Sequence, residues 1–238
     1  MKTTVLHKAD TRGHADHGWL NAYHSFSFAS WYNPDRIQFG MLRVLNDDTV
    51  AAGMGFGTHP HDNMEIITIP LEGDLAHKDS MGNAATIKTG DVQVMSAGTG
   101  IQHSEFNPNA DQHTKLFQIW VFPKYRNVEP RYQQITLDTT EQKNNFAQIL
   151  SPNPDDAGVW IHQDAWFHLA DFEAGFEKTY ELKKEGNGLY VFVISGTITV
   201  DGQELETRDG LGITDFKTLD FKATTDAKFL LMEIPMKQ

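Results

Sequence analysis

Residues 64–91, MEIITIPLEGDLAHKDSMGNAATIKTGD, contain three short runs of β-forming residues separated by turns. A turn signal around Gly73 separates the first two runs, and another around Gly82 separates the second from the third. Short apolar runs bounded by Gly, Asn and Asp are typical of strands joined by hairpins. The stretch therefore predicts neighbouring antiparallel strands, and this prediction can be extended along the chain in both directions.

The same pattern dominates the rest of the sequence. Residues 24–31 alternate between aromatic and small polar side chains, and further β-rich runs occupy residues 40–45, 85–98, 115–122 and 189–202. Many short strands with such turns favour a sandwich or a barrel. Helical periodicity is scarce, and the best helical candidate is residues 164–172. The sequence thus predicts an all-β protein.

The two halves of the chain resemble each other. Residues 189–215, LYVFVISGTITVDGQELETRDGLGITD, repeat the order seen in residues 64–91: an apolar strand, a glycine turn, a second strand, a polar hairpin and a corner with glycine. Residues 123–134, with two prolines and mixed charge, break the β pattern and are read as a linker or crossing segment. This weak duplication predicts two barrel units, assigned to residues 1–132 and 133–238.

Composition excludes several classes of protein. Acidic residues number 32 against 20 basic ones, and the resulting net charge of −12 disfavours direct nucleic-acid binding. The chain has no cysteine, which excludes disulfides, thiolate metal sites and cysteine nucleophiles. No segment has the roughly 20 apolar residues that span a bilayer, and the N-terminus lacks the apolar core of a signal peptide. We expect a cytoplasmic protein, and a monomer is compatible with the sequence.

Two pairs of potential metal ligands occur in the first half. His59 and His61 flank Pro60, which biases the preceding residue toward an extended backbone. His103 and Glu105 have the same spacing. Residues i and i+2 of a strand point to the same face, so each pair aims two side chains at one spot. On neighbouring strands, three imidazoles and one carboxylate would converge inside a barrel.

Such ligands suit one divalent first-row metal: Fe, Mn, Co, Ni, Cu or Zn. Four protein ligands around a metal that prefers six leave two positions open, which indicates ligand binding or catalysis. Glu65 is a competing carboxylate, four residues after His61. It could be a ligand, a hydrogen-bond partner of a ligating histidine, or a solvent-facing charge. Glu105 is preferred because it is paired with His103.

The second half lacks the first pair of ligands. Alignment of the glycine turns of the two halves places Leu182 at the position of His59 and Lys184 at that of His61. A residue needed for folding alone would be expected in both copies. The difference predicts a site in the first half only.

The remaining histidines and the tryptophans are read as packing or surface residues. His14, Asp16 and His17 lie between glycines and are expected in a turn with surface histidines. The isolated histidines are expected to be satisfied core or surface groups, and the tryptophans to be packing groups: His24, His77, His113, His162 and His168, and Trp19, Trp31, Trp120, Trp160 and Trp166.

Two motifs resemble those of the cupin superfamily. The patterns G-x5-H-x-H-x3-E and G-x7-G-x-G-x2-H-x3-N fall on Gly53, His59, His61 and Glu65, and on Gly90, Gly98, Gly100, His103 and Asn107. Gly98 replaces the proline that is usual in cupins, and the spacer in the second motif is longer. More narrowly, residues 17–35, 55–66, 71–83 and 95–108 resemble the pirin family, especially bacterial pirin-like proteins described as quercetin 2,3-dioxygenases.

This resemblance implies a bicupin, in which two antiparallel, jelly-roll-like β-barrels pack face to face. It implies a mononuclear metal, with iron as the first choice, in the N-terminal barrel and none in the C-terminal barrel. The family's ligands fall on His59, His61, His103 and Glu105, which are all present. Glu65 is a conventional ligand in other cupins but not in pirins.

The resemblance also implies a reaction. The protein would cleave the heterocycle of flavonols such as quercetin with O₂ and release carbon monoxide. Metal coordination lowers the pKa of the flavonol 3-hydroxyl, and Glu105 would be the general base. Phe56 and Met41 are candidates to line the pocket. The alternatives are a non-enzymatic, metal- and redox-dependent protein-interaction module, as in eukaryotic pirins, and an oxygenase for another enolisable phenol.

Overall fold

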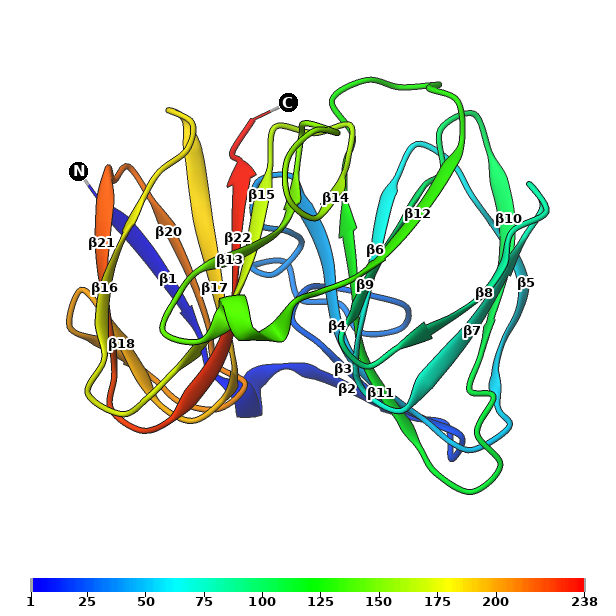
Figure 1. Cartoon of the computed structure of the whole chain (residues 1–238), viewed down its shortest axis with the longest axis horizontal. Helices are drawn as coiled ribbons and strands as arrows, with labels where there is room; N and C mark the ends of the chain where they lie inside the picture. Colours follow the sequence, from blue (N-terminus) through cyan, green and yellow to red (C-terminus); the bar gives the residue numbers. More distant parts are fainter. Residues whose placement is uncertain (1, 238) are drawn as a thin grey trace.

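The computed structural model, which describes residues 2–237, contains four β-sheets stacked in layers (Figure 1). Each barrel pairs a seven-stranded inner sheet with a four-stranded outer sheet, and the two inner sheets face each other at the centre of the molecule. The predicted all-β, two-barrel fold is confirmed. None of the helices within residues 2–237 is long and apolar enough to cross a membrane.

The first barrel has the inner-sheet order β12-β9-β6-β11-β4-β3-β2 and the outer-sheet order β5-β10-β7-β8. Its strands are β2 (Gly13–Asp16), β3 (Leu20–His24), β4 (Leu42–Val50), β5 (Gly55–His61), β6 (Glu65–Glu72), β7 (Asp74–Asp79), β8 (Ala84–Lys88), β9 (Asp91–Ser96), β10 (Ile101–Phe106), β11 (Thr114–Val121) and β12 (Arg131–Thr136).

The second barrel has the inner-sheet order β1-β20-β17-β22-β15-β13-β14 and the outer-sheet order β16-β21-β18-β19. Its strands are β1 (Thr3–His7), β13 (Ala147–Ser151), β14 (Val159–Trp160), β15 (Trp166–Phe172), β16 (Glu177–Glu181), β17 (Asn187–Ser195), β18 (Ile198–Val200), β19 (Gln203–Leu205), β20 (Gly210–Thr214), β21 (Thr218–Ala223) and β22 (Ala227–Pro235). Two short 3₁₀ helices, η1 (Ala9–Thr11) and η2 (Thr139–Gln142), lie outside the barrels' sheets.

The chain crosses between the barrels at both ends of the first one. Strand β1 pairs antiparallel with β20 of the second barrel, so the chain crosses to the first barrel between β1 and β2. Strand β12 pairs antiparallel with β9 of the first barrel, so the chain returns to the second barrel between β12 and β13. Position 132, after which we expect the domain division, lies within β12, and that division stays a prediction. Among the pairings of the named strands, β13 with β14 is the parallel one.

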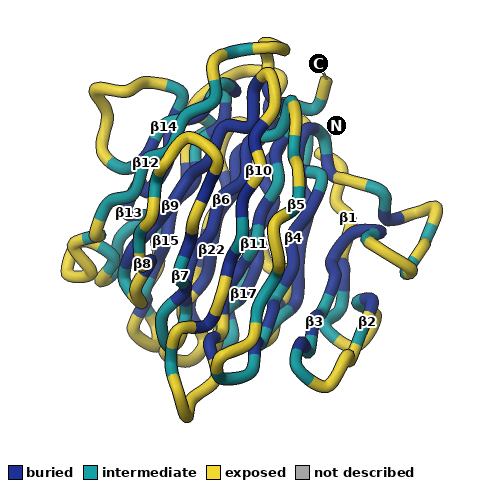
Figure 2. Tube along the Cα trace, turned by 90° about the vertical axis from the view of Figure 1, so that its right-hand side faces the viewer, coloured by how far each residue is buried: buried dark blue, intermediate teal, exposed yellow. Residues whose placement is uncertain are grey.

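The contact between the barrels is apolar. Along β6, Ile67 and Ile69 point toward the second barrel, while Ile66 points into the first. The rings of Phe117 and Phe192 meet edge to face across this contact at 5.4 Å. Burial of each such side chain stabilises the fold by about 1.5–3 kcal/mol. The central strands of each inner sheet, such as β6 and β17, are accordingly buried along most of their length, whereas many residues at the hairpin ends are exposed (Figure 2).

The duplication seen in the sequence corresponds to matching hairpins. Gly73 separates β6 from β7, and Gly196 separates β17 from β18. Both glycines have a positive φ, +74° and +82°, which residues with a side chain rarely adopt. In each barrel, therefore, a glycine allows the chain to pass from the inner to the outer sheet.

Two local predictions are wrong and a third is right only in part. Residues 164–172 form no helix, because Trp166–Phe172 is strand β15, buried on both faces, and a short apolar run of this kind does not distinguish strand from helix. Residues 13–16 form strand β2, and the expected turn begins only at its end, where the backbone N–H of Gly18 donates to Asp16 Oδ1 and that of His17 donates to the carbonyl oxygen of Leu20. His14 and His17 are both exposed as expected. Met41 lies in the core between the barrels and lines no site.

Candidate metal centre

Three histidines converge at the open end of the first barrel. Strands β5 and β10 are antiparallel neighbours, and His103 lies directly opposite His59. The ring centroids of His59, His61 and His103 are 4.4 to 4.9 Å apart. One nitrogen from each ring lies within 4.8 Å of the others, a separation that one bound cation can bridge.

Glu105 joins the cluster through a second, overlapping group. Potential ligand atoms of His77, His103 and Glu105 also lie within 4.8 Å of one another. His103 and Glu105 are each 2% exposed, whereas His59 and His61 are half-buried. The structure thus brings the four predicted residues together, with His103 at their centre. Their role as ligands stays a prediction.

Several buried atoms of this cluster lack hydrogen-bond partners within residues 2–237. Both ring nitrogens of His103 and the Oε1 atom of Glu105 are unpaired. Each buried polar group without a partner costs about 1–3 kcal/mol. A divalent cation would satisfy one histidine nitrogen and the carboxylate oxygen at once, so these residues fit the metal that the sequence predicts.

Protonation also favours metal binding. Burial and, to a smaller extent, the neighbouring histidines lower the pKa of His61 to about 4 and that of His103 to about 3. Both rings are therefore neutral at pH 7, which is the form that binds metals. His59 Nδ1 lies 2.8 Å from the carbonyl oxygen of Gly57, to which it donates, so Nε2 is the nitrogen that would face a metal.

His77 is the residue that the sequence interpretation missed. It faces Glu105 across the β7–β10 pair, and its Nε2 lies 3.2 Å from Asp79 Oδ2. Asp79 is itself held by hydrogen bonds from Asn83 N and Nδ2, at 3.0 and 2.8 Å. The His77-x-Asp79 spacing, which places both side chains on one face of a strand, is the feature of the sequence that could have identified His77.

Glu65 lies outside both clusters. The chain turns at Asn63 (φ 46°) between β5 and β6, so counting four residues from His61 does not keep Glu65 on the same face. Its Oε2 accepts a hydrogen bond of 2.6 Å from Ser96 Oγ. Burial raises the pKa of this carboxyl group to about 7. Glu65 is therefore a buried hydrogen-bond acceptor beside the inter-barrel core.

Aromatic rings border the accessible side of the histidines. The Trp120 ring lies 5.0 Å from the His61 ring and 5.4 Å from Phe28, edge-on in both cases, and both aromatic side chains are half-buried. Trp120 thus packs against His61 and Phe28 as well as against the apolar core of the first barrel. Phe56 instead packs against Trp19 at 5.2 Å, beside a different apolar cluster of the first barrel.

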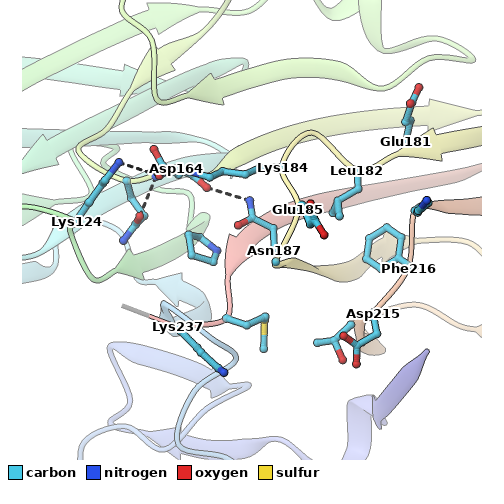
Figure 3. A pocket seen from close by; sticks show the side chains of 16 residues that line it. Lys124, Asp164, Glu181, Leu182, Lys184, Glu185, Asn187, Asp215, Phe216 and Lys237 are labelled. Carbon is cyan, nitrogen blue, oxygen red and sulfur yellow. Dashed lines mark hydrogen bonds and ion pairs between the residues drawn. The ribbon is translucent and has the colours of Figure 1, made fainter. Parts of the chain in front are cut away.

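The second barrel offers no comparable ligands at the matching positions. A cavity of about 1260 Å³ opens at its mouth, and Leu182 and Lys184 line it where the first barrel has His59 and His61 (Figure 3). Asp164 in this cavity forms ion pairs with Lys124, at 3.0 Å, and with Lys184. The interior below is filled with aromatic and aliphatic side chains such as Phe221 and Phe229, whose rings stack.

Known proteins match the chain over nearly its whole length. Residues 5–121 match the profile of the Pirin family, and residues 148–234 match that of the quercetinase C-terminal cupin domain. The chain is 42% identical over 234 residues to quercetin 2,3-dioxygenase of Escherichia coli K12, covering 97% of this chain and 98% of that protein. It is 41% identical over 225 residues to a pirin-like protein of Caulobacter vibrioides, covering 94% and 96%.

A solved structure matches the fold equally closely. The crystal structure of the bacterial pirin YhhW in complex with nickel(II) from Escherichia coli superposes with a TM-score of 0.93 at 39% sequence identity. The match covers 98% of this chain and 99% of the other.

Proposed function

Because the chain belongs to the pirin family of bicupin proteins, we propose that it is a metal-dependent dioxygenase that opens the heterocycle of flavonols such as quercetin with O₂ and releases carbon monoxide. We propose His59, His61, His103 and Glu105 as the ligands, and iron as the native metal. The name of the E. coli relative supports the reaction, and the nickel(II) complex of YhhW supports a divalent metal.

The observation that carries the proposal is the set of buried ligand atoms without partners. His103 Nδ1 and Nε2 and Glu105 Oε1 have none within the described chain, and they lie beside two half-buried histidines. A histidine–carboxylate set of this composition selects divalent first-row metals. Because two of the four side chains are partly accessible, a small molecule can approach from the side of His59 and His61.

The bound metal would supply a Lewis acid that makes a coordinated hydroxyl group more acidic. Because Gln118 Nε2 already donates to Oε2 at 2.8 Å, Glu105 would bind the metal through Oε1. When released from the metal, the same oxygen would accept the proton of the flavonol 3-hydroxyl group. Without a bound metal, burial raises the pKa of this carboxyl group. Trp120 and Phe28 offer apolar contact for a flat aromatic ring beside His61.

The proposal is tested with protein loaded with Fe(II) and, separately, with Ni(II). Quercetin consumption, O₂ uptake and carbon monoxide release are measured together, and we expect them in equal amounts. His59→Ala should abolish all three, whereas Lys184→Ala, the matching position in the second barrel, should change none. The same measurements with other enolisable phenols identify the preferred substrate.

A metal-replete protein that consumes no O₂ with any of these compounds would contradict the enzymatic proposal. Partner binding that depends on the oxidation state of iron would then favour the interaction module instead.

A further inference from the structure

A row of polar side chains crosses the inner wall of the first barrel. Gln93, Thr68, Gln118, Asn46 and His24 are successive partners on β9, β6, β11, β4 and β3. Residues paired in this way lie on the same face of a sheet. Four of the five are buried, and Gln118 is partly accessible. We call this row the polar rung.

The second barrel has a mainly apolar row at the matching place, with a histidine at one end. There Leu211, Val191, Leu231 and His168 are successive partners on β20, β17, β22 and β15. Leu231 occupies the position of Gln118. The fold therefore does not require a polar residue at this position, and the glutamine needs an explanation from its own contacts.

Gln118 contacts the proposed general base. Its Nε2 donates to Glu105 Oε2 at 2.8 Å, while its Oε1 accepts from Trp120 Nε1 at 3.3 Å. The indole N–H is a donor only, so it selects the orientation of the amide. With the amide reversed, an oxygen would face the carboxylate and an NH₂ group would face the indole N–H, and both contacts would be repulsive.

We propose that Gln118 is a positioning residue that holds Glu105 Oε1 toward the histidines, and that Trp120 keeps the Gln118 amide in its donating orientation. The proposal rests on the metal centre proposed above. Because the hydrogen bond occupies Oε2, the free Oε1 is the oxygen left for the metal or for the substrate proton. The aromatic wall of the site and its carboxylate are thus linked by two consecutive hydrogen bonds.

The first test is metal binding, which does not depend on any reaction. Gln118→Met keeps the length of the side chain but removes its donor, and Gln93→Met makes the same change on the polar rung two strands away. Co²⁺ is titrated into each protein, and its visible absorption reports both affinity and coordination. We expect Gln118→Met to raise the dissociation constant about 10- to 100-fold and to alter the spectrum, as loss of a hydrogen bond to a ligand does. Gln93→Met should stay within threefold of the parent.

The second test is a double-mutant cycle. Trp120→Phe keeps an aromatic ring but removes the indole N–H, and we expect a smaller loss of Co²⁺ affinity, about threefold. In the Gln118→Met background the same substitution should have no further effect, because its partner is gone. Where turnover is measurable, Gln118→Met should lower kcat more than it changes KM.

Equal Co²⁺ affinity and spectra for Gln118→Met and the parent, or equal losses for the two methionine variants, would overturn the proposal. So would full additivity of Trp120→Phe and Gln118→Met. A protein that binds Co²⁺ as expected but does not turn over flavonols would leave the positioning role standing while contradicting the dioxygenase function.

Discussion

His168 should make the second barrel sensitive to acid. The ring is 3% exposed, its Nδ1 has no hydrogen-bond partner within the described chain, and it packs edge-on against Tyr180 at 5.5 Å. Burial, with a smaller contribution from Lys183, lowers the pKa of His168 to about 3 from an ordinary value of 6.5. The folded protein therefore keeps this ring neutral at pH values where the unfolded chain binds a proton.

The sign of the effect follows from this difference. Above pH 6.5 neither state protonates the ring, and its contribution to stability is complete. As the pH falls below 6.5, the unfolded state gains a proton that the folded state takes up only near pH 3, so the free energy of unfolding decreases. Between pH 7 and pH 5, this single group should lower the free energy of unfolding by about 2 kcal/mol.

The measurement compares the parent with His168→Leu by urea denaturation at pH 7 and pH 5. Leucine suits the apolar surroundings, so we expect similar stability at pH 7 and a variant about 2 kcal/mol more stable than the parent at pH 5. His113→Gln, which changes an exposed imidazole, should follow the pH dependence of the parent. If His168→Leu lost as much stability between pH 7 and pH 5 as the parent, the buried neutral ring would not be the cause.

Three further predictions concern the metal centre. His103→Ala should lower the metal content to less than about a tenth of the parent's, because the central donor is lost. The content is measured by elemental analysis of protein purified without added metal. Unchanged content would remove His103 from the ligand set. Glu105→Gln should keep measurable metal but slow quercetin turnover by about 10²- to 10⁴-fold, because an amide cannot accept the proton; parental kcat would exclude Glu105 as the base. His77→Gln should retain metal with about 10-fold weaker affinity, because it removes the imidazole beside Glu105. The affinity is measured by competition with a chelator. Complete loss of metal would make His77 a ligand.

The two barrels share a fold but differ in the polarity of the side chains that line their interiors. Both share strand order and hairpin glycines, yet at one level of the inner wall the first has Gln118 beside Thr68 and the second has Leu231 beside Val191. Polar side chains at that level cost stability unless they have partners. Their presence in the barrel that also holds the histidine cluster is consistent with function rather than folding.

Much of this protein could be predicted from the sequence, because local patterns were sufficient. Alternating and short apolar runs with glycine turns depend on the period of two in a strand, which is a local property. The His59-x-His61 and His103-x-Glu105 pairs follow from the same period. Their convergence required that β5 and β10 be neighbours in a register that places His103 opposite His59. The absence of matching histidines in the second half was equally visible.

Other features depended on the tertiary structure, because they arise from residues far apart in the chain. His77 comes close to Glu105 only through the pairing of β7 with β10, and Gln118 reaches the same carboxylate from β11 in the other sheet. Glu65 could not be placed by counting, because the turn at Asn63 moves it to another strand and another face. Strand periodicity tells which side chains share a face, but the order of strands in the sheets and the closure of the barrel decide which faces meet.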